Sequence, residues 1–198
     1  MKKPKDLTAA LLGCRSCTVR ETVYRSSQLR HLRTLTSSLG ALHSANRYSV
    51  PEMSHALYLA DGPDQAMRES TRAYHNDFGA NAIVPAYAIF PVTVDLEKVL
   101  DLTDESTQDA LETTLMELTG DWRAAYRAWE KNGRTRVVTQ ELGRAAFEGK
   151  WEAVKYPSAY NAERWNLVVF SENTRIAVQA NLPDPVLQAM MHLNSLPQ

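Results

Sequence analysis

The stretch A-L-Y-L-A-D-G-P-D over residues 56–64 carries the clearest signal for the fold of the chain. Its first five residues are apolar or aromatic, which predicts a buried strand over Ala56–Ala60. Asp61 is expected to cap a helix, and Pro63 suits the first helical turn. The sequence therefore predicts a strand that is followed at once by a helix running to about Asn76.

Strand and helix signals continue to alternate on both sides of this unit. Strands are predicted over residues 21–25, 82–94 (broken or edged by Pro85 and Pro91), 151–155 and 165–171. Helices are predicted over residues 107–118, 121–130 and 135–147, with a C-terminal helix over 183–196. There is no internal repeat and no linker-like tract. The pattern predicts one α+β domain over residues 1–198.

The composition is that of a soluble globular enzyme-sized domain. Of 198 residues, 44% are hydrophobic and 23% are charged. No apolar run reaches the roughly 18 residues that a membrane helix needs, so we expect no membrane association. The net charge is −1, but the first 35 residues carry eight Lys or Arg against two acidic residues. These basic residues form no continuous stripe, which favours a solvated face or a small-anion site over nucleic-acid binding.

The cysteine and histidine patterns predict no metal site. Cys14 and Cys17 form a single C-x-x-C without a second pair, and the five histidines lack metal-ligand spacing. Two free thiols in a reducing cytoplasm are the favoured interpretation. An export signal is disfavoured because the apolar segment ahead of Cys14 spans only Leu7–Gly13.

Several enzyme classes are excluded by missing motifs. The sequence has no Walker loop, no G-x-G-x-x-G, no G-x-S-x-G and no H-E-x-x-H. Two polar residues nevertheless occupy notable positions. Tyr58 lies inside an apolar strand, where its hydroxyl needs a partner, and Glu69 lies at the flank of the packed face of a helix. Taken singly, a core tyrosine and a solvated glutamate are the simpler interpretations.

An ordered set of short motifs carries more information than any one of them. They are V-Y-R at 23–25, N-R-Y at 46–48, A-L-Y-L-A at 56–60, A-M-R-E at 66–69, D-L-T-D at 101–104, P-S-A at 157–159 and W-N-L-V-V-F at 165–170. In this order the set resembles the RES-domain family of bacterial toxins, over about residues 20–172.

The resemblance implies a fold similar to that of ADP-ribosyltransferases, with mixed and antiparallel β-sheets flanked by helices. It implies a cytoplasmic toxin that degrades NAD+, which is its substrate and not a cofactor. The implied reaction cleaves the bond between nicotinamide and ribose, with water or inorganic phosphate as acceptor. The implied partner is a helix-turn-helix, Xre-like antitoxin or another inhibitory protein, and a homodimer is compatible with the resemblance.

The resemblance also implies the site residues. The catalytic set is Glu69, Arg47, Tyr58 and Ser158, and the substrate-binding set is Arg25, Tyr48 and Asn166. Glu69 would stabilise the positive charge that develops on the ribose, while the arginines would hold the pyrophosphate. The Tyr58 ring would stack on nicotinamide, and Ser158 would hydrogen-bond the ribose or the amide. Nicotinamide leaves as a neutral molecule, so neither a general acid nor a metal is required.

Two alternatives stay open at this point. The first is a mono-ADP-ribosyltransferase, in which a macromolecule accepts the ribose. The second is a catalytically inactive RES-like binding module. The loop A-N-R-Y-S-V-P-E-M at 45–53 motivates the second alternative, because it lacks the glycines that commonly flank the arginine in the family.

Overall fold

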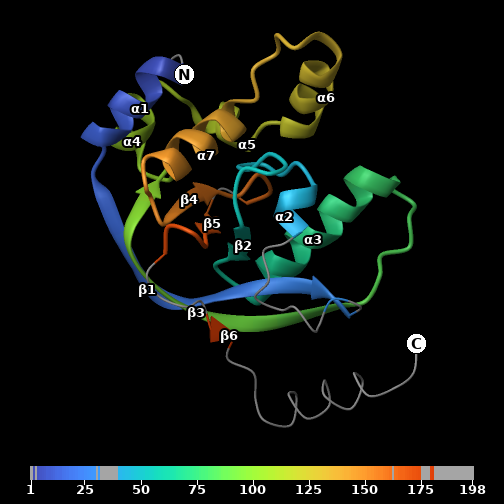
Figure 1. The fold of residues 1–198 in the computed structure, drawn as a ribbon. Helices are drawn as coiled ribbons and strands as arrows, with labels where there is room; N and C mark the ends of the chain where they lie inside the picture. The colour runs from blue at the N-terminus through green and yellow to red at the C-terminus, as the bar shows by residue number, and fades with distance from the viewer. Residues whose placement is uncertain are drawn as a thin grey trace. The chain divides into compact units, whose positions relative to one another are not determined.

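The computed structural model describes residues 2, 4–29, 31, 40–161, 163–174 and 179–180, which form both helices and strands (Figure 1). The elements are α1 (Pro4–Gly13), β1 (Ser16–Gln28), α2 (Gly40–His43), β2 (Ala56–Ala60), α3 (Pro63–Phe78), β3 (Tyr87–Asp101), α4 (Glu105–Ala110), α5 (Leu115–Thr119), α6 (Trp122–Asn132), α7 (Val138–Glu148), β4 (Ala153–Pro157), β5 (Trp165–Phe170) and β6 (Gln179–Ala180). The predicted mixed α and β class is confirmed. The helix predicted over 183–196 lies outside the described residues.

The six strands are hydrogen-bonded in the order β1-β2-β5-β4-β3-β6, and β1 also pairs with β3. Strands β3 and β4 run parallel, with Val99 opposite Ala153. The pairs β1–β2, β4–β5 and β3–β6 are antiparallel. The sheet is therefore mixed, as the family resemblance implies.

The chain divides into two compact units. The first unit comprises Met1–Val19, Ser38–Tyr58 and Leu96–Ile176, and the second comprises Arg20–Ser37, Leu59–Asp95 and Ala177–Gln198. Strands β1, β2 and β3 contribute residues to both units. The single domain expected over residues 1–198 stays a prediction.

A large apolar core organises the first unit. Helix α1 contributes Leu7 and Leu11, and α7 contributes Leu142 and Ala146, in each case one helical turn apart. This spacing places each pair on one helix face, which packs into the core. Helix α7 contacts α1, α5 and β4, so it lies at the centre of this unit (Figure 1).

The start of helix α3, in the second unit, differs from the prediction. Its N-cap is Gly62, in an extended conformation and without a side-chain capping bond. The expected cap by Asp61 is therefore wrong, because Pro63 occupies the first helical position and makes its own predecessor the cap. Gly79 ends the helix at φ 98, a positive value that favours glycine, and lies three residues beyond the predicted end near Asn76.

Two other local predictions differ from the structure. Helix 107–118 is two short helices, because Asp104 caps α4 and Thr114 caps α5 in a capping box with Glu117. Strand β3 continues through Pro91, whose fixed φ is compatible with extended backbone. Helix α1 was not predicted. Within the described ranges, no helix is both long and apolar enough to cross a bilayer.

Candidate active site

The arginine loop, residues 46–49, presents Arg47 to the C-terminal end of α5. Its Nη1 donates hydrogen bonds to the carbonyl oxygens of Leu118, at 2.8 Å, and Gly120, at 3.1 Å. Carbonyl groups at a helix C-terminus have no partner within the helix and carry partial negative charge, so a cation there is stabilised. The guanidinium is thus fixed through one of its three nitrogens.

The Tyr58 hydroxyl holds the same loop from strand β2. It accepts a hydrogen bond from the backbone N–H of Tyr48 at 3.1 Å and shares another with Ser49 Oγ at 3.1 Å. Burial raises the pKa of Tyr58 to about 12, so the hydroxyl is protonated at neutral pH. The prediction that this hydroxyl has a partner is confirmed.

Tyr48 links the loop to the β4–β5 pair. Its side chain is 0% exposed, and its ring centroid lies 4.5 Å from that of Tyr156. Burial raises the pKa of Tyr48 well above its ordinary value. In the described part of the chain, its hydroxyl makes no hydrogen bond. Tyr156 in turn pairs with Asn166 across the two strands.

Ser158 lies at the end of the β4–β5 pair that carries Tyr156 and Asn166. It follows directly after Pro157, which pairs with Trp165, and its side chain is 3% exposed. Its Oγ accepts a hydrogen bond from the Tyr160 N–H at 3.1 Å. The first unit therefore joins five predicted site residues through one series of contacts: Arg47, Tyr48, Tyr58, Ser158 and Asn166.

The other two predicted site residues belong to the second unit. Glu69 is partly buried on α3, and its Oε1 accepts a hydrogen bond at 2.9 Å from Gln65, which is 1% exposed. Arg25 lies on β1 beside Tyr24, which pairs with Ala60. Burial lowers the pKa of Arg25 to about 10, so it is still charged at neutral pH. That all seven residues share one pocket stays a prediction.

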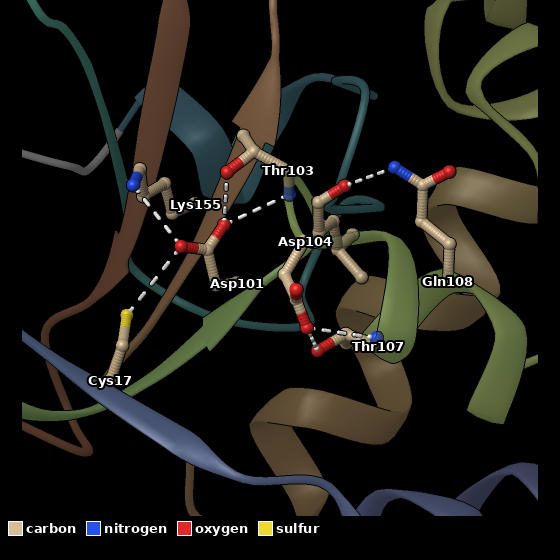
Figure 2. Close-up of polar contacts among 8 residues, drawn as sticks. Cys17, Asp101, Thr103, Asp104, Thr107, Gln108 and Lys155 are labelled. Atoms are coloured by element: carbon tan, nitrogen blue, oxygen red, sulfur yellow. Dashed lines mark hydrogen bonds and ion pairs between the residues drawn. The ribbon is translucent and has the colours of Figure 1, made fainter.

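The D-L-T-D turn has a structural role, as Figure 2 shows. Asp101 accepts from the Thr103 N–H at 2.9 Å and pairs with Lys155 of β4 at 3.1 Å. Asp104 accepts from the Thr107 N–H at 3.0 Å and so caps α4. Asp101 thus ends β3 and connects it to β4, and Asp104 caps α4. These contacts give both carboxylates a structural role.

The first unit also contains a largely apolar pocket of about 570 Å³, between α1, α6, α7 and the segment that follows the arginine loop. Its lining is Leu7, Thr8, Val50, Pro51, Tyr126, Trp129, Thr135, Val137, Gln140, Glu141, Arg144, Ala145 and Glu148. None of the seven predicted site residues lines it. Among the described residues, no group of His, Cys, Asp and Glu is arranged to hold a metal ion.

Comparison with known proteins identifies a family model and solved structures of similar fold. The model of the RES domain matches residues 22–190, a range that includes all seven predicted site residues. A chain in the crystal structure of the M. tuberculosis MbcT–MbcA toxin–antitoxin complex superposes with a TM-score of 0.66 at 23% sequence identity, covering 96% of this chain and 97% of that chain. No curated protein sequence matches this one.

Proposed function

Because the chain belongs to the RES-domain family, we propose that it is an NAD+-degrading enzyme that cleaves the bond between nicotinamide and ribose. The observation that carries the proposal is the state of Arg47. Its Nη1 is bound to protein carbonyls, whereas Nε and Nη2 make no hydrogen bond to any described residue. A guanidinium has five N–H donors, so three of them are available to phosphate oxygens.

The residues around Arg47 suit the rest of the substrate. The partly buried Tyr58 ring would provide aromatic surface for a nicotinamide ring, while the fully buried Tyr48 ring packs on Tyr156. Ser158 and Asn166 would provide polar groups for a ribose or an amide. We propose that Glu69 acts on the ribose. Its carboxylate would stabilise positive charge at the anomeric carbon as the bond to nicotinamide breaks, or orient the attacking water.

The proposal includes a setting and a fold relationship. The similar crystal structure is that of a toxin with its antitoxin, and we propose that this chain is likewise a cytoplasmic toxin restrained by an inhibitory protein, for which a helix-turn-helix protein is the first candidate. We also propose that its fold is related to that of ADP-ribosyltransferases, which bind the same dinucleotide.

The decisive test is nicotinamide release from NAD+ by the purified chain alone, without and with inorganic phosphate. Release in both conditions supports a glycohydrolase, and release only with phosphate supports a phosphorylase. Glu69→Gln is expected to slow release about 100-fold or more, since one lost transition-state contact is worth roughly 3 kcal/mol. Glu148→Gln, an exposed change on α7, serves as the matched control and should leave the rate unchanged.

Other results would redirect the assignment. Release that requires a protein or nucleic-acid acceptor would make the chain an ADP-ribosyltransferase. Equal NAD+ consumption by the wild type and Glu69→Gln would remove Glu69 from the reaction. An absence of NAD+ loss both with purified protein and in expressing cells would leave the binding module as the remaining interpretation.

A further inference from the structure

Helix α7 contacts the arginine loop through a buried side chain. Gln140 is 6% exposed, and its Nε2 donates a hydrogen bond at 2.9 Å to the carbonyl oxygen of Asn46. Asn46 is the residue directly before Arg47, and its own N–H donates to the Ser49 carbonyl at 2.8 Å. Gln140 therefore binds the loop at the point where it closes on itself.

Three residues further along α7, Gly143 allows the loop backbone to lie directly against the helix. A Cβ at this position would lie 2.7 Å from the Tyr48 carbonyl carbon and 3.0 Å from its Cα, and closer still to its oxygen. Glycine in a helix interior lowers the stability of the helix relative to alanine, and Gly143 lies within α7. The close approach of the Tyr48 backbone gives the physical reason for a glycine here.

We propose that Gln140 and Gly143 are positioning residues that aim Arg47, a role that rests on the proposed function of Arg47 as a pyrophosphate ligand. Gln140 binds the backbone of Asn46, directly before Arg47, and Gly143 lies against the backbone of Tyr48, directly after it. A Cβ at position 143 must displace the Tyr48 backbone, because the atoms that it meets belong to the main chain and not to a flexible side chain. This displacement moves the adjacent arginine and weakens the bond from the Tyr48 N–H to Tyr58.

The first test reads the loop geometry without any substrate. Gly143→Ala and Gln140→Met are compared with Arg144→Ala, an exposed change on the same helix. Hydrogen exchange of the Tyr48 amide is expected to be about tenfold faster or more in the two loop variants and unchanged in the control. An unchanged rate in both folded variants overturns the proposal. If Gly143→Ala fails to fold, Gln140→Met carries the test, since it removes one hydrogen bond at nearly constant volume.

The second test asks whether the effect passes through Arg47. Affinity for ADP-ribose is expected to fall about tenfold in Gln140→Met, and the same change made in Arg47→Ala is expected to shift affinity less than twofold. Affinity for nicotinamide riboside, which has no pyrophosphate, should change less than twofold in Gln140→Met. Equal losses in both backgrounds, or equal losses for both ligands, would indicate a general structural role and overturn the proposal.

The two tests separate this inference from the proposed function. If the wild type leaves NAD+ intact but exchange and ADP-ribose affinity respond as expected, the reaction is wrong and the positioning role holds. If the wild type cleaves NAD+ and neither measurement responds, the positioning role alone is wrong.

Discussion

The contacts described for the arginine and for the glutamate of the proposed active site differ in how far they reach along the chain. In the Arg47 loop, Tyr48 is bound by the Tyr58 hydroxyl of β2, 10 residues away in the sequence. Arg47 itself binds two carbonyls at the end of α5, 71 and 73 residues away. Asn46 is bound by Gln140 of α7, 94 residues away. The hydrogen bond described for Glu69 comes from Gln65, one turn earlier in the same helix. The orientation of the arginine thus depends on tertiary contacts, whereas the contact described for the glutamate lies within its own helix.

The largest expected effect is a loss of both activity and stability in Arg47→Met. This change removes the proposed phosphate ligand and leaves the carbonyls of Leu118 and Gly120 without their donor. We expect NAD+ cleavage to fall at least about 100-fold. The free energy of unfolding should fall by about 2 kcal/mol, the usual range for hydrogen bonds to a charged group. Denaturant unfolding and nicotinamide release measure the two effects.

In contrast, Glu69→Gln should lose activity while its thermal midpoint stays within about 1 or 2 °C of the wild type. A shift of this size corresponds to a change of less than about 0.5 kcal/mol in the free energy of unfolding. A loss of stability in Glu69→Gln equal to that in Arg47→Met would show that the two sites are held alike.

Tyr58→Phe is expected to lower the free energy of unfolding by about 1–2 kcal/mol. The change leaves the Tyr48 N–H and the Ser49 hydroxyl without their shared partner, while the ring stays in place. NAD+ cleavage should fall as well, because the loop that carries Arg47 loosens. Tyr160→Phe, on a partly buried tyrosine in the β4–β5 turn, provides a comparison. Wild-type stability in Tyr58→Phe would contradict the role of this hydroxyl.

Stability should also depend on Tyr58 at alkaline pH. Its pKa is raised to about 12 in the folded protein, against a usual value near 10. Between these values the unfolded chain releases the proton and the folded chain keeps it, so the contribution is fully present below pH 10 and is lost as pH rises toward 12. Melting curves at pH 9 and pH 11.5 should show a larger decrease for the wild type than for Tyr58→Phe. Equal decreases would contradict the assignment.

The smallest expected effect is that of Thr114→Ala at the start of α5. The capping box between Thr114 and Glu117 is lost, which costs about 1 kcal/mol. Activity should fall only slightly, because the carbonyls that bind Arg47 lie at the other end of this helix. Met116→Ala, at an 81% exposed position of α5, should change stability by less than about 0.5 kcal/mol. A large activity loss in Thr114→Ala would extend the arginine support to all of α5.

Much of the local structure was predictable because its signals are short-range. Helix α6 has Asp121 as its cap and ends at Gly133 in the left-handed region, close to the predicted bounds. The split between α4 and α5 was also readable, since T-L-M-E at 114–117 is a capping-box signature. The apolar spacing of Leu111, Leu115 and Leu118 concealed it, although Leu111 lies at the C-cap of α4 and Leu115 is exposed on α5.

The candidate site was also predictable only where short-range sequence signals exist. The ordered motifs identified the family and the residue types, and the apolar strand context of Tyr58 indicated a partner for its hydroxyl. No sequence signal identified that partner as the Tyr48 backbone, or marked Gln140 as a ligand of the loop. A glycine inside a predicted helix, at position 143, was the one available indication, since such a glycine commonly marks a close approach.

By itself, the sequence determined the mixed helix and strand class, the start of α3 after β2 and the family, because these depend on neighbouring residues and on motif order. Only the tertiary structure decided what Arg47 binds and which groups hold its loop. A backbone carbonyl or N–H is present at every residue, so its identity as a partner carries no sequence signature. Packing of distant elements makes that choice.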